Sequence, residues 1–366
     1  MKCFDLIILG PLPNANNIKD GMIQRVADID KNIFNGKKRL YIKFSIKKNI
    51  YNNHLPQKID ENLYVVNISI LNITIIKKLF SHAKYIYIHS LHNVILSLPW
   101  ILFTTAKIYY DVHGIVVEES LYNKKYITYI IASICEKMFF SFKKNFNIVY
   151  VTNTMKEYIR KKYRFAAKDF IIPIYPQNLK NINNEKDQIE RIKLEYNIDN
   201  NDTVFIYSGN TQKWQNIELM LQYIKILSSN ANYKFFILTA DYNKMIEFIR
   251  KKKIKNVIVK SVSPIELSTY YEISHYGFLL RDHHPLNHVA CPTKAIEYLA
   301  FGIIPIVLEE NIGDFKQLGY EYLSINNINN EIKLRPRKSS KNMEISKYLY
   351  EFSNNEKKLL KNEIKA

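Results

Sequence analysis

The sequence predicts an α/β protein built from two doubly wound domains in tandem. Short apolar segments alternate with segments of helical length along nearly the whole chain, which is typical of parallel sheets covered by helices on both faces. With 366 residues the chain is too long for one ordinary core. The alternation also lapses once, around residues 173–201, and these observations together favour two domains joined by a linker.

In the first half of the chain, runs rich in β-branched and aromatic residues favour strands, and longer segments between them favour helices. Strands are expected at Phe4–Leu9, Leu40–Phe44, Leu63–Val66, Tyr85–Ile88, Ile108–Tyr110, Ile148–Val151 and Phe170–Ile172. Helices are expected at Gly21–Phe34, His92–Thr105, Tyr122–Lys144 and Thr154–Lys162. The first domain is therefore predicted to span residues 1–173.

The stretch 174–201 is rich in Pro, Asn and charged residues, and it is the predicted linker and entry to a second domain, with one helix at Gln188–Tyr196. Strands then follow at Val204–Tyr207, Tyr233–Leu238, Asn256–Val259, Tyr276–Leu280 and Ile304–Leu308. Helices lie between them at Ile217–Leu227, Asn243–Lys251, Pro264–Ile273 and Thr293–Ala300. We predict a second domain at residues 202–341 and a C-terminal segment at 342–366 with a helix at Ser346–Lys361.

The chain is strongly basic, with a net charge of +19 and a pI near 9.5. The excess is nearly all lysine in a sequence also rich in Ile, Asn and Tyr, so an AT-rich genome is one explanation for it. A functional basic surface would favour anionic partners such as phospholipid, nucleotide or nucleic acid. Cys3, Cys135 and Cys291 are odd in number and form no Cys-x-x-Cys pair, which favours a reducing compartment and argues against structural zinc.

Neither a secretory signal nor a membrane span is expected. The N-terminal run Met1–Leu9 is short and carries Asp5, unlike a signal peptide. The most apolar later stretch, Val94–Ala106, is interrupted by Pro99 and is shorter than the roughly 20 residues that a span needs. We expect a cytoplasmic protein, either free or peripheral at the inner face of the cytoplasmic membrane.

The most informative segment is Arg281–Val307, where a polar loop leaves one strand and a short helix leads to the next. Pro292 suits the first turn of that helix and Gly302 its end. Lys294 and Glu297 stand three residues apart and share a helix face. A helix N-terminus and a lysine both attract phosphate, and a carboxylate can accept hydrogen bonds from ribose hydroxyls. The segment therefore predicts a nucleoside-diphosphate site.

This segment resembles the donor-site signature of glycosyltransferase family 4, in the variant Pro-x-Lys-x-x-Glu-Tyr-x-Ala-x-Gly-x-x-Pro, and most of the chain can be aligned with such an enzyme. The resemblance implies the GT-B fold, in which two Rossmann-like domains face each other across a cleft, and a C-terminal helix that often returns to the first domain. It implies retaining transfer from a nucleoside-diphosphate sugar without a metal or another cofactor. Many family members carry a further Glu eight positions before the one matched by Glu297, and here that position is Val289.

The resemblance also assigns roles to single residues. Lys294, Lys213 and Arg281 would hold the diphosphate, with Arg281 replacing a family arginine whose position is taken by Asn210, and Glu297 would hold the ribose. His113 would hydrogen-bond the pyrophosphate or the sugar. The expected donor-binding backbone and caps are Gly21, Gly209, Asn210, Ser263, Pro292 and Thr293. A loop salt bridge between Arg281 and Asp282 remains an alternative for Arg281, and an ordinary strand-to-helix loop remains one for Gly21.

Other motifs are better explained without chemistry. Asp28-Ile-Asp30 resembles a metal signature, yet it falls in a predicted helix where the two side chains diverge. His89 and His92 lack an obvious third ligand for zinc. His283, His284 and His288 either contact the transferred sugar or are simply exposed. Several lysine and arginine clusters suit solvated helix ends, and Tyr126–Phe142, an apolar helix flanked by lysines, suits either the core or an anionic membrane.

We therefore expect a hexosyltransferase that uses a nucleoside-diphosphate sugar, UDP-sugar before others, and a saccharide or polyprenyl-linked saccharide acceptor in cell-surface polysaccharide synthesis. Two alternatives stay open. A sugar-nucleotide epimerase can share the architecture but needs groups that move a ring proton. A nucleic-acid-binding protein would explain the charge, but the sequence contains no known reading module, so no nucleic-acid partner is expected.

Overall fold

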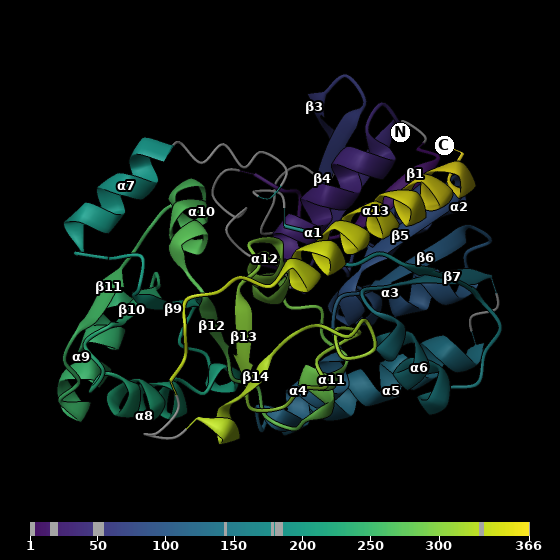
Figure 1. Ribbon diagram of the computed structural model, residues 1–366. Coiled ribbons are helices and arrows are strands. Elements are labelled where there is room, and N and C mark those ends of the chain that lie inside the picture. The colour runs from purple at the N-terminus through teal and green to yellow at the C-terminus, as the bar shows by residue number, and fades with distance from the viewer. Residues whose placement is uncertain are drawn as a thin grey trace. The chain divides into compact units, whose positions relative to one another are not determined.

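The computed structural model describes residues 4–14, 21–46, 55–142, 145–176, 179, 186–328 and 333–365. The chain divides into two compact units, Met1–Ile174 with Phe352–Ala366, and Tyr175–Glu351 (Figure 1). Each unit is an α/β layer structure around its own sheet, as the alternation of strands and helices predicts.

The sheet of the first unit has eight strands in the order β3-β4-β2-β1-β5-β6-β7-β8. All neighbouring pairs are parallel except β3 and β4, which are antiparallel. The strands are β1 (Leu6–Leu9), β2 (Arg39–Ser45), β3 (Gln57–Asp60), β4 (Leu63–Ser69), β5 (Tyr85–His89), β6 (Lys107–Val112), β7 (Phe146–Tyr150) and β8 (Lys168–Ile171). The order reverses beside β1, a topological switch point of the kind where open α/β sheets bind ligands.

Helices cover this sheet on both faces. They are α1 (Gly21–Ile29), which continues into a π-helical turn at Asp30–Phe34, α2 (Ile73–Ser81), α3 (Ser90–Phe103), α4 (Val116–Tyr122), α5 (Tyr126–Phe142) and α6 (Asn153–Lys162). One core cluster joins α1 residues Val26 and Ile29 to β-strand residues such as Ile8 and to Leu360 and Ile364 near the C-terminus. The end of the chain therefore belongs to the core of the first unit.

The second unit holds a six-stranded parallel sheet in the order β11-β10-β9-β12-β13-β14. Its strands are β9 (Thr203–Ser208), β10 (Tyr233–Leu238), β11 (Val257–Lys260), β12 (Tyr276–Leu279), β13 (Ile304–Val307) and β14 (Leu323–Ser324). Its helices are α7 (Lys186–Glu195), α8 (Ile217–Leu227), α9 (Tyr242–Lys252), α10 (Pro264–Ile273), α11 (Pro285–His288) and α12 (Thr293–Ala300), with 3-10 turns at Lys213–Gln215 and Ile325–Asn327.

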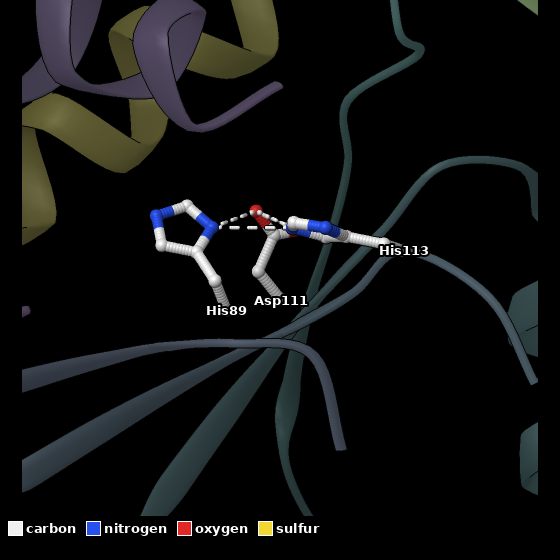
Figure 2. A group of neighbouring side chains, drawn as sticks. All are labelled: His89, Asp111 and His113. Carbon is white, nitrogen blue, oxygen red and sulfur yellow. Dashed lines mark hydrogen bonds and ion pairs between the residues drawn. The ribbon is translucent and has the colours of Figure 1, made fainter. Parts of the chain in front are cut away.

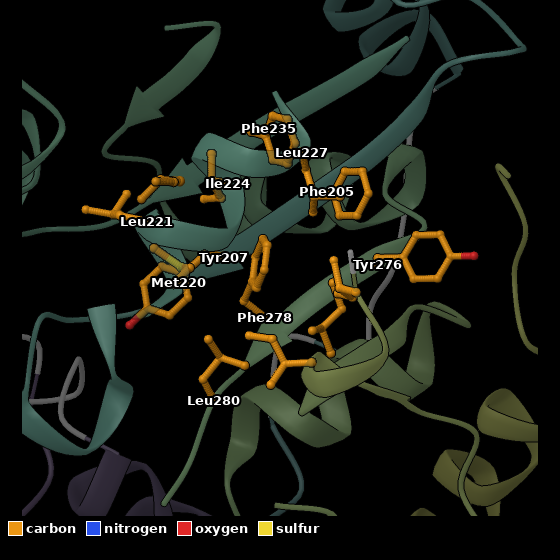
Figure 3. Close-up of a cluster of buried hydrophobic side chains, with 14 of the residues drawn as sticks. Phe205, Tyr207, Met220, Leu221, Ile224, Leu227, Phe235, Tyr276, Phe278 and Leu280 are labelled. Carbon is orange, nitrogen blue, oxygen red and sulfur yellow. The ribbon is translucent and has the colours of Figure 1, made fainter. Parts of the chain in front are cut away.

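The core of this sheet is aromatic. Figure 3 shows Phe205, Phe235, Tyr276 and Phe278 from neighbouring strands on the same side as the α8 residues that pack on them. Ring centroids of Phe205 and Phe235 lie 4.9 Å apart in a stacked arrangement, and those of Phe205 and Tyr276 lie 5.5 Å apart. Phe235, Phe205 and Tyr276 lie side by side on the neighbouring parallel strands β10, β9 and β12. Because the strands are parallel, the loops after β9 and β12 lie at the same edge of the sheet.

The last helix, α13 (Ser340–Glu363), contributes its first half to the second unit and its second half to the first. Asn342, in the first half, donates from Nδ2 to the carbonyls of Ile303 and Glu321. Glu356, in the second half, accepts from the backbone N–H of Ile171. The division of the chain at Ile174 and Tyr175 lies at the start of the segment interpreted as a linker, much of which falls outside the described residues.

Several elements differ from the sequence expectation. The expected helix Tyr122–Lys144 starts later, as α5 at Tyr126, because the turn Asn123–Lys125 precedes it and Lys124 adopts a positive φ of 57°. Helix α4 was not expected. Lys143 and Lys144 lie outside the described residues. Strand β3 was not expected, since all four of its residues are exposed and they carry no apolar alternation. No helix in the described part of the chain is long and apolar enough to cross a bilayer.

Candidate functional site

Helix α12 is held against the sheet of the second unit by a close fit between a glycine and a tyrosine. A Cβ on Gly277 of β12 would lie 2.4 Å from the ring of Tyr298, which is fully buried. The helix begins after Pro292 and ends before Gly302, whose φ is +64°, so the predicted boundaries are confirmed. Since Pro292 provides no side-chain cap, the N–H groups of the first turn remain suited to an anion.

Lys294 lies on the inner side of α12 and is only 8% exposed. Its Nζ donates to Oε1 of Gln215 at 3.0 Å and lies 3.9 Å from the ring centroid of Tyr207. Burial, together with the positive charge of Arg281, holds the pKa of Lys294 well below its usual range, although Glu297 opposes the shift. A buried lysine with a depressed pKa gains a proton readily when an anion arrives.

Arg281 follows β12 and is the second cation beside the Tyr207 ring. Its Nη1 donates to Oδ1 of Asn287 at 3.2 Å, and its Nε is buried and finds no hydrogen-bond partner in the part of the chain that the structure describes. Burial lowers the pKa of Arg281 to about 10, even though Tyr207 raises it. The side chains of Lys294 and Arg281 are buried close to each other, and the hydrogen-bond partners described for them, Gln215 and Asn287, are neutral. Glu297 acts on Lys294 through its charge only. Such a pair is suited to a multiply charged anion.

Glu297 lies one turn after Lys294 and is half-buried. Its Oε2 accepts a hydrogen bond of 2.8 Å from the hydroxyl of Tyr271, and that hydroxyl also lies 2.6 Å from Oγ of Ser208. The tyrosine comes from α10 and the serine from the end of β9. The carboxylate is therefore oriented by a buried polar chain.

Gly209 and Lys294 lie in direct contact. Gly209 has φ +144°, and a Cβ placed there would lie 3.0 Å from Nζ of Lys294. Glycine at the end of β9 therefore leaves the space that the lysine head group occupies. The next residue, Asn210, is exposed, and its carbonyl accepts the hydroxyl of Tyr207. The structure thus brings Gly209, Lys294 and Arg281 to the same edge of the second sheet.

The other residues predicted in this unit lie around that centre. Lys213 is exposed and begins the 3-10 turn that ends with Gln215, the partner of Lys294. Thr293 is the first residue of α12. Ser263 caps α10 in a capping box with Glu266, which confirms the predicted cap. Ser263 belongs to the loop after β11, two strands away from β9 in the sheet and therefore away from Gly209 at the end of β9.

The position of the missing family glutamate is filled by an apolar side chain. Val289 is 2% exposed and offers no polar group. The structure instead brings Glu309, which follows β13, to this loop: its Oε2 lies 2.7 Å from Nδ1 of His283. His284 acts as the cap of α11, where its Nδ1 accepts from the backbone of Leu286. Glu309 could have been found from the sequence, because it ends a buried strand on the ligand-binding edge.

In the first unit, His113 belongs to a buried polar cluster at the ends of β5 and β6. Figure 2 shows the rings of His89 and His113 on either side of the Asp111 carboxylate. Oδ2 of Asp111 lies 3.1 Å from Nε2 of His113 and 3.4 Å from Nδ1 of His89, and the two ring nitrogens lie 3.1 Å apart. His89 pairs with these residues and not with His92, which is exposed on α3.

Arg25 of α1 holds Asp111 of this cluster in place through hydrogen bonds. It donates from Nε and Nη2 to both oxygens of Asp111 at 3.2 and 3.0 Å, and from Nη1 to the carbonyl of Ile172 at 2.7 Å. Burial alone would raise the pKa of Asp111, but Arg25 and the histidines hold it well below its ordinary value. Burial lowers the pKa of His89 to about 4, so this ring is neutral at pH 7.

The ionised Asp111 orients His113. A carboxylate accepts hydrogen bonds only, and the shorter of its two histidine distances places the proton on Nε2 of His113. Nδ1 of His113, which has no partner among the described residues, is then an acceptor. Such a nitrogen can accept a hydrogen bond from a sugar hydroxyl.

Ligand atoms of His89, Asp111 and His113 lie within 4.8 Å of one another, a spacing that could also suit a metal ion. Two features favour a hydrogen-bonded cluster over a metal site. Arg25 and the hydroxyl of Tyr87 already donate to the Asp111 oxygens. No described residue provides the outer ring nitrogens, Nε2 of His89 and Nδ1 of His113, with the hydrogen-bond acceptors that orient metal-binding histidines.

The remaining predictions in the first unit concern its first loop and the Asp-x-Asp motif. Gly21 is exposed at the start of α1, and no atom lies near a Cβ placed on it. Its neighbour Asp20 lies outside the described residues. Asp28 pairs with the buried Lys357, and Asp30 pairs with Arg39 at 2.7 Å. The two carboxylates thus diverge into separate ion pairs, as expected for residues two positions apart on a helix.

A cavity of about 480 Å³ lies elsewhere in the first unit, between α2 and α3. It is lined by Ile73, Lys77, Phe80, Ser81, Pro99, Trp100, Phe103, Thr104 and Thr105. Because the ends of α2 and α3 lead into the amino ends of β5 and β6, this cavity lies at the opposite edge of the sheet from His113.

No protein-family model matches the chain, and no curated protein matches it. Solved structures do match its whole length. Sucrose-phosphate synthase from Thermosynechococcus elongatus has a TM-score of 0.61 at 11% identity and covers 98% of this chain and 94% of its own. The UDP-forming α,α-trehalose-phosphate synthase from Burkholderia vietnamiensis has a TM-score of 0.63 at 8% identity, with 99% and 97% covered.

A third match is HepE from Anabaena, solved with UDP and glucose, which has a TM-score of 0.59 at 8% identity and covers 99% of this chain and 94% of its own. At such low identities these similarities show the fold alone. The structural neighbours are GT-B glycosyltransferases, and the two sheets found here have the Rossmann-like character of that fold. The predicted fold class is therefore confirmed: the chain has the GT-B fold.

Proposed function

We propose that this protein transfers a hexosyl group from a nucleoside-diphosphate sugar to a saccharide acceptor. The observation that carries the proposal is the buried pair of cations, Lys294 and Arg281, beside Gly209 and one helical turn from Glu297. A pyrophosphate supplies the anionic charge that this pair lacks, and a ribose supplies hydroxyl donors for the carboxylate. A UDP-sugar is favoured because trehalose-phosphate synthase is described as UDP-forming and HepE was solved with UDP and glucose.

In the mechanism that we propose, the main role of the protein is to stabilise the leaving diphosphate. Lys294 and Arg281 contact its oxygens, and the first N–H groups of α12, after Pro292 and Thr293, add a positive helix end. Lys213, exposed on the neighbouring turn, adds a further charge. The negative charge on the leaving group grows along the reaction, so these groups stabilise the transition state more than the bound substrate.

Burial makes Lys294 responsive to this charge. Burial and Arg281 disfavour the charged form of the lysine, and a diphosphate beside it would favour that form. The resemblance to retaining enzymes implies that the new bond keeps the anomeric configuration and that an oxygen of the leaving group accepts the acceptor's proton. No step in this scheme requires a metal ion.

Two residues of the first unit complete the proposed donor contacts. We assign His113 to a hydroxyl of the transferred sugar or to the pyrophosphate, because Asp111 orients its ring and leaves Nδ1 as an acceptor. We assign Gly21 to a close backbone approach, since no atom of the described residues lies within 4 Å of a Cβ placed on it. Asn210 and Ser263 are proposed to face the ribose and the base through their backbone.

The acceptor that we propose is a saccharide or a polyprenyl-linked saccharide in the synthesis of a cell-surface polysaccharide such as capsule or O-antigen. This role would place the protein in the cytoplasm at the inner face of the membrane. A GT-B-fold sugar-nucleotide epimerase is the alternative. It would bind the same donor but return an isomerised sugar without any acceptor.

A thermal-shift panel of UDP and GDP sugars tests the proposal. A ligand at about a hundred times its dissociation constant stabilises the fold by about 2.7 kcal/mol, which is readily measured. We expect UDP compounds to raise the unfolding temperature of the protein and of the variant Glu218→Ala, an exposed control on α8. Glu297→Ala should lose the effect. An equal response in both variants would place the ribose elsewhere.

Product analysis separates the two enzyme classes. Incubation of the protein with UDP-glucose alone should leave the sugar unchanged, apart from slow hydrolysis. When a mixture of oligosaccharide acceptors is added, the protein should release UDP from the donor. An isomerised sugar formed from the donor alone would favour the epimerase.

A further inference from the structure

Helix α5 of the first unit carries a row of exposed isoleucines. Ile127 is 77% exposed, Ile130 54%, Ile131 47% and Ile134 54%. Their spacing of three and four residues places them on one face of the helix. Tyr126, 59% exposed, extends the row at the start of the helix. We call these five residues the α5 face. Contiguous exposed apolar residues of this kind mark contact sites for other molecules.

The opposite side of α5 is firmly anchored in the core. Ala132, Phe139 and Phe140 are buried, and the ring of Phe139 lies 5.3 Å from that of Tyr110 and 5.1 Å from that of Phe146. The helix is therefore fixed on the sheet by its inner side, and the exposure of the α5 face does not result from a loosely packed helix.

The exposed charges of α5 and of the turn before it are of one sign. Lys124 and Lys125 precede the helix and Lys137 lies within it, and all three are exposed. The one carboxylate of α5, Glu136, is 2% exposed and is bonded to Lys162 at 2.9 Å and to the hydroxyl of Tyr163 at 2.7 Å. The helix thus presents apolar side chains and lysines to the solvent and keeps its acid inside.

We propose that the α5 face docks onto an anionic lipid bilayer, with α5 lying in the plane of the membrane surface. The isoleucines enter the boundary between head groups and acyl chains, and the lysines contact the anionic head groups. A helix of 17 residues is about 25 Å long, which gives a long line of contact. A second copy of this chain is a poorer partner, because a symmetric pairing of α5 faces brings the same lysines together.

This inference does not depend on the proposed transfer reaction, since it concerns only α4, α5 and the sheet beneath them. A protein with such a face would bind membranes whether or not it binds a nucleotide. If the acceptor is lipid-linked, the face would bring the protein to it.

Vesicle flotation with the full chain tests the docking. Vesicles of phosphatidylcholine with a quarter of phosphatidylglycerol should bind the protein, and pure phosphatidylcholine should bind it about a hundredfold more weakly, because each of the three lysines contributes roughly fivefold. Raising the salt concentration should release the protein from the anionic vesicles. Equal binding to both vesicles, or no binding to either, would overturn the proposal.

Two variants attribute the binding to α5. The double variant Ile127→Ser/Ile130→Ser and the double variant Lys124→Gln/Lys125→Gln should each reduce binding to anionic vesicles by tenfold or more. Leu194→Ser changes an equally exposed residue, at 78%, on α7 of the second unit and should bind like the unchanged protein.

Circular dichroism checks that each variant is folded. If the isoleucine variant unfolds, the lysine variant alone decides whether α5 is responsible for binding. Wild-type binding by both α5 variants would overturn the proposal. The proposal would also be overturned if gel filtration showed a dimer and the isoleucine variant were a monomer, because a second copy would then cover the α5 face.

Discussion

Replacement of Lys294 by methionine should stabilise the ligand-free second unit and weaken UDP binding at the same time. Lys294 is buried next to Arg281, and burial and that neighbour depress its pKa. Near neutral pH the unfolded chain therefore holds this proton more tightly than the folded chain does, which lowers the stability of the fold. Methionine has a similar length and no charge, so it removes this cost.

The size of the effect follows from two opposing contributions. Replacing a buried ion pair by apolar residues of similar volume stabilises by roughly 1–4 kcal/mol, and we use this range for the removal of the Lys294 charge. Losing the hydrogen bond to Gln215 costs about 1–2 kcal/mol. A net gain of about 1 kcal/mol would raise the unfolding temperature by about 2–4 °C in a unit of this size. A lysine–phosphate hydrogen bond contributes about 1.5–3 kcal/mol, so UDP should bind about 10- to 150-fold more weakly.

Calorimetry measures both quantities. Differential scanning gives the unfolding temperature without ligand, and titration gives the dissociation constant of UDP. Titrations in two buffers of different ionisation enthalpy should also reveal proton uptake by the unchanged protein, which the variant loses. Lys225→Met, at an exposed position of α8, should alter none of these. A lower unfolding temperature for Lys294→Met would show that the lysine stabilises the fold, and an unchanged UDP affinity would refute its role.

Three further predictions concern other parts of the molecule. Glu297→Gln keeps the shape of the side chain but weakens its hydrogen bonds to ribose, so titration should show UDP affinity lowered by about tenfold, and an unchanged affinity would contradict the assignment. Stability should fall as the pH drops from 6.5 to 4, because burial holds the pKa values of His89 and His275 at about 4 and the unfolded chain takes up these protons first. Over that interval the His89 contribution is on the order of 3 kcal/mol, and urea unfolding of His89→Gln should show a flatter pH dependence. Gly277→Ala should destabilise the second unit by about 1–3 kcal/mol in urea unfolding, since the new Cβ overlaps Tyr298, and a neutral result would mean that the ring can move.

The strands and the boundaries of α12 could be predicted because their signals are local. Pro292 and Gly302 restrict their own backbone, and buried parallel strands are continuous apolar runs. Strand β3 could not be predicted, since its exposed residues pair only through the backbone. The start of α5 was predicted four residues too early, because Asn-Lys-Lys is compatible with a helix and only the positive φ of Lys124 marks the turn.

The residues that support the candidate site were harder to find. Arg25 and Asp111 are 86 positions apart and are joined only by the folding of α1 over β6. Gln215 and Tyr207 surround Lys294 from elements that are distant in sequence. The charged residues of a signature can be located from spacing, whereas the neutral residues that surround and orient them depend on tertiary packing.

A crystal structure of the protein with UDP tests the central claim most directly. The account predicts a pyrophosphate oxygen within about 3 Å of Nζ of Lys294, which would have left Gln215, and a ribose hydroxyl at Glu297. A nucleotide bound away from α12, with Lys294 still bonded to Gln215, would contradict it.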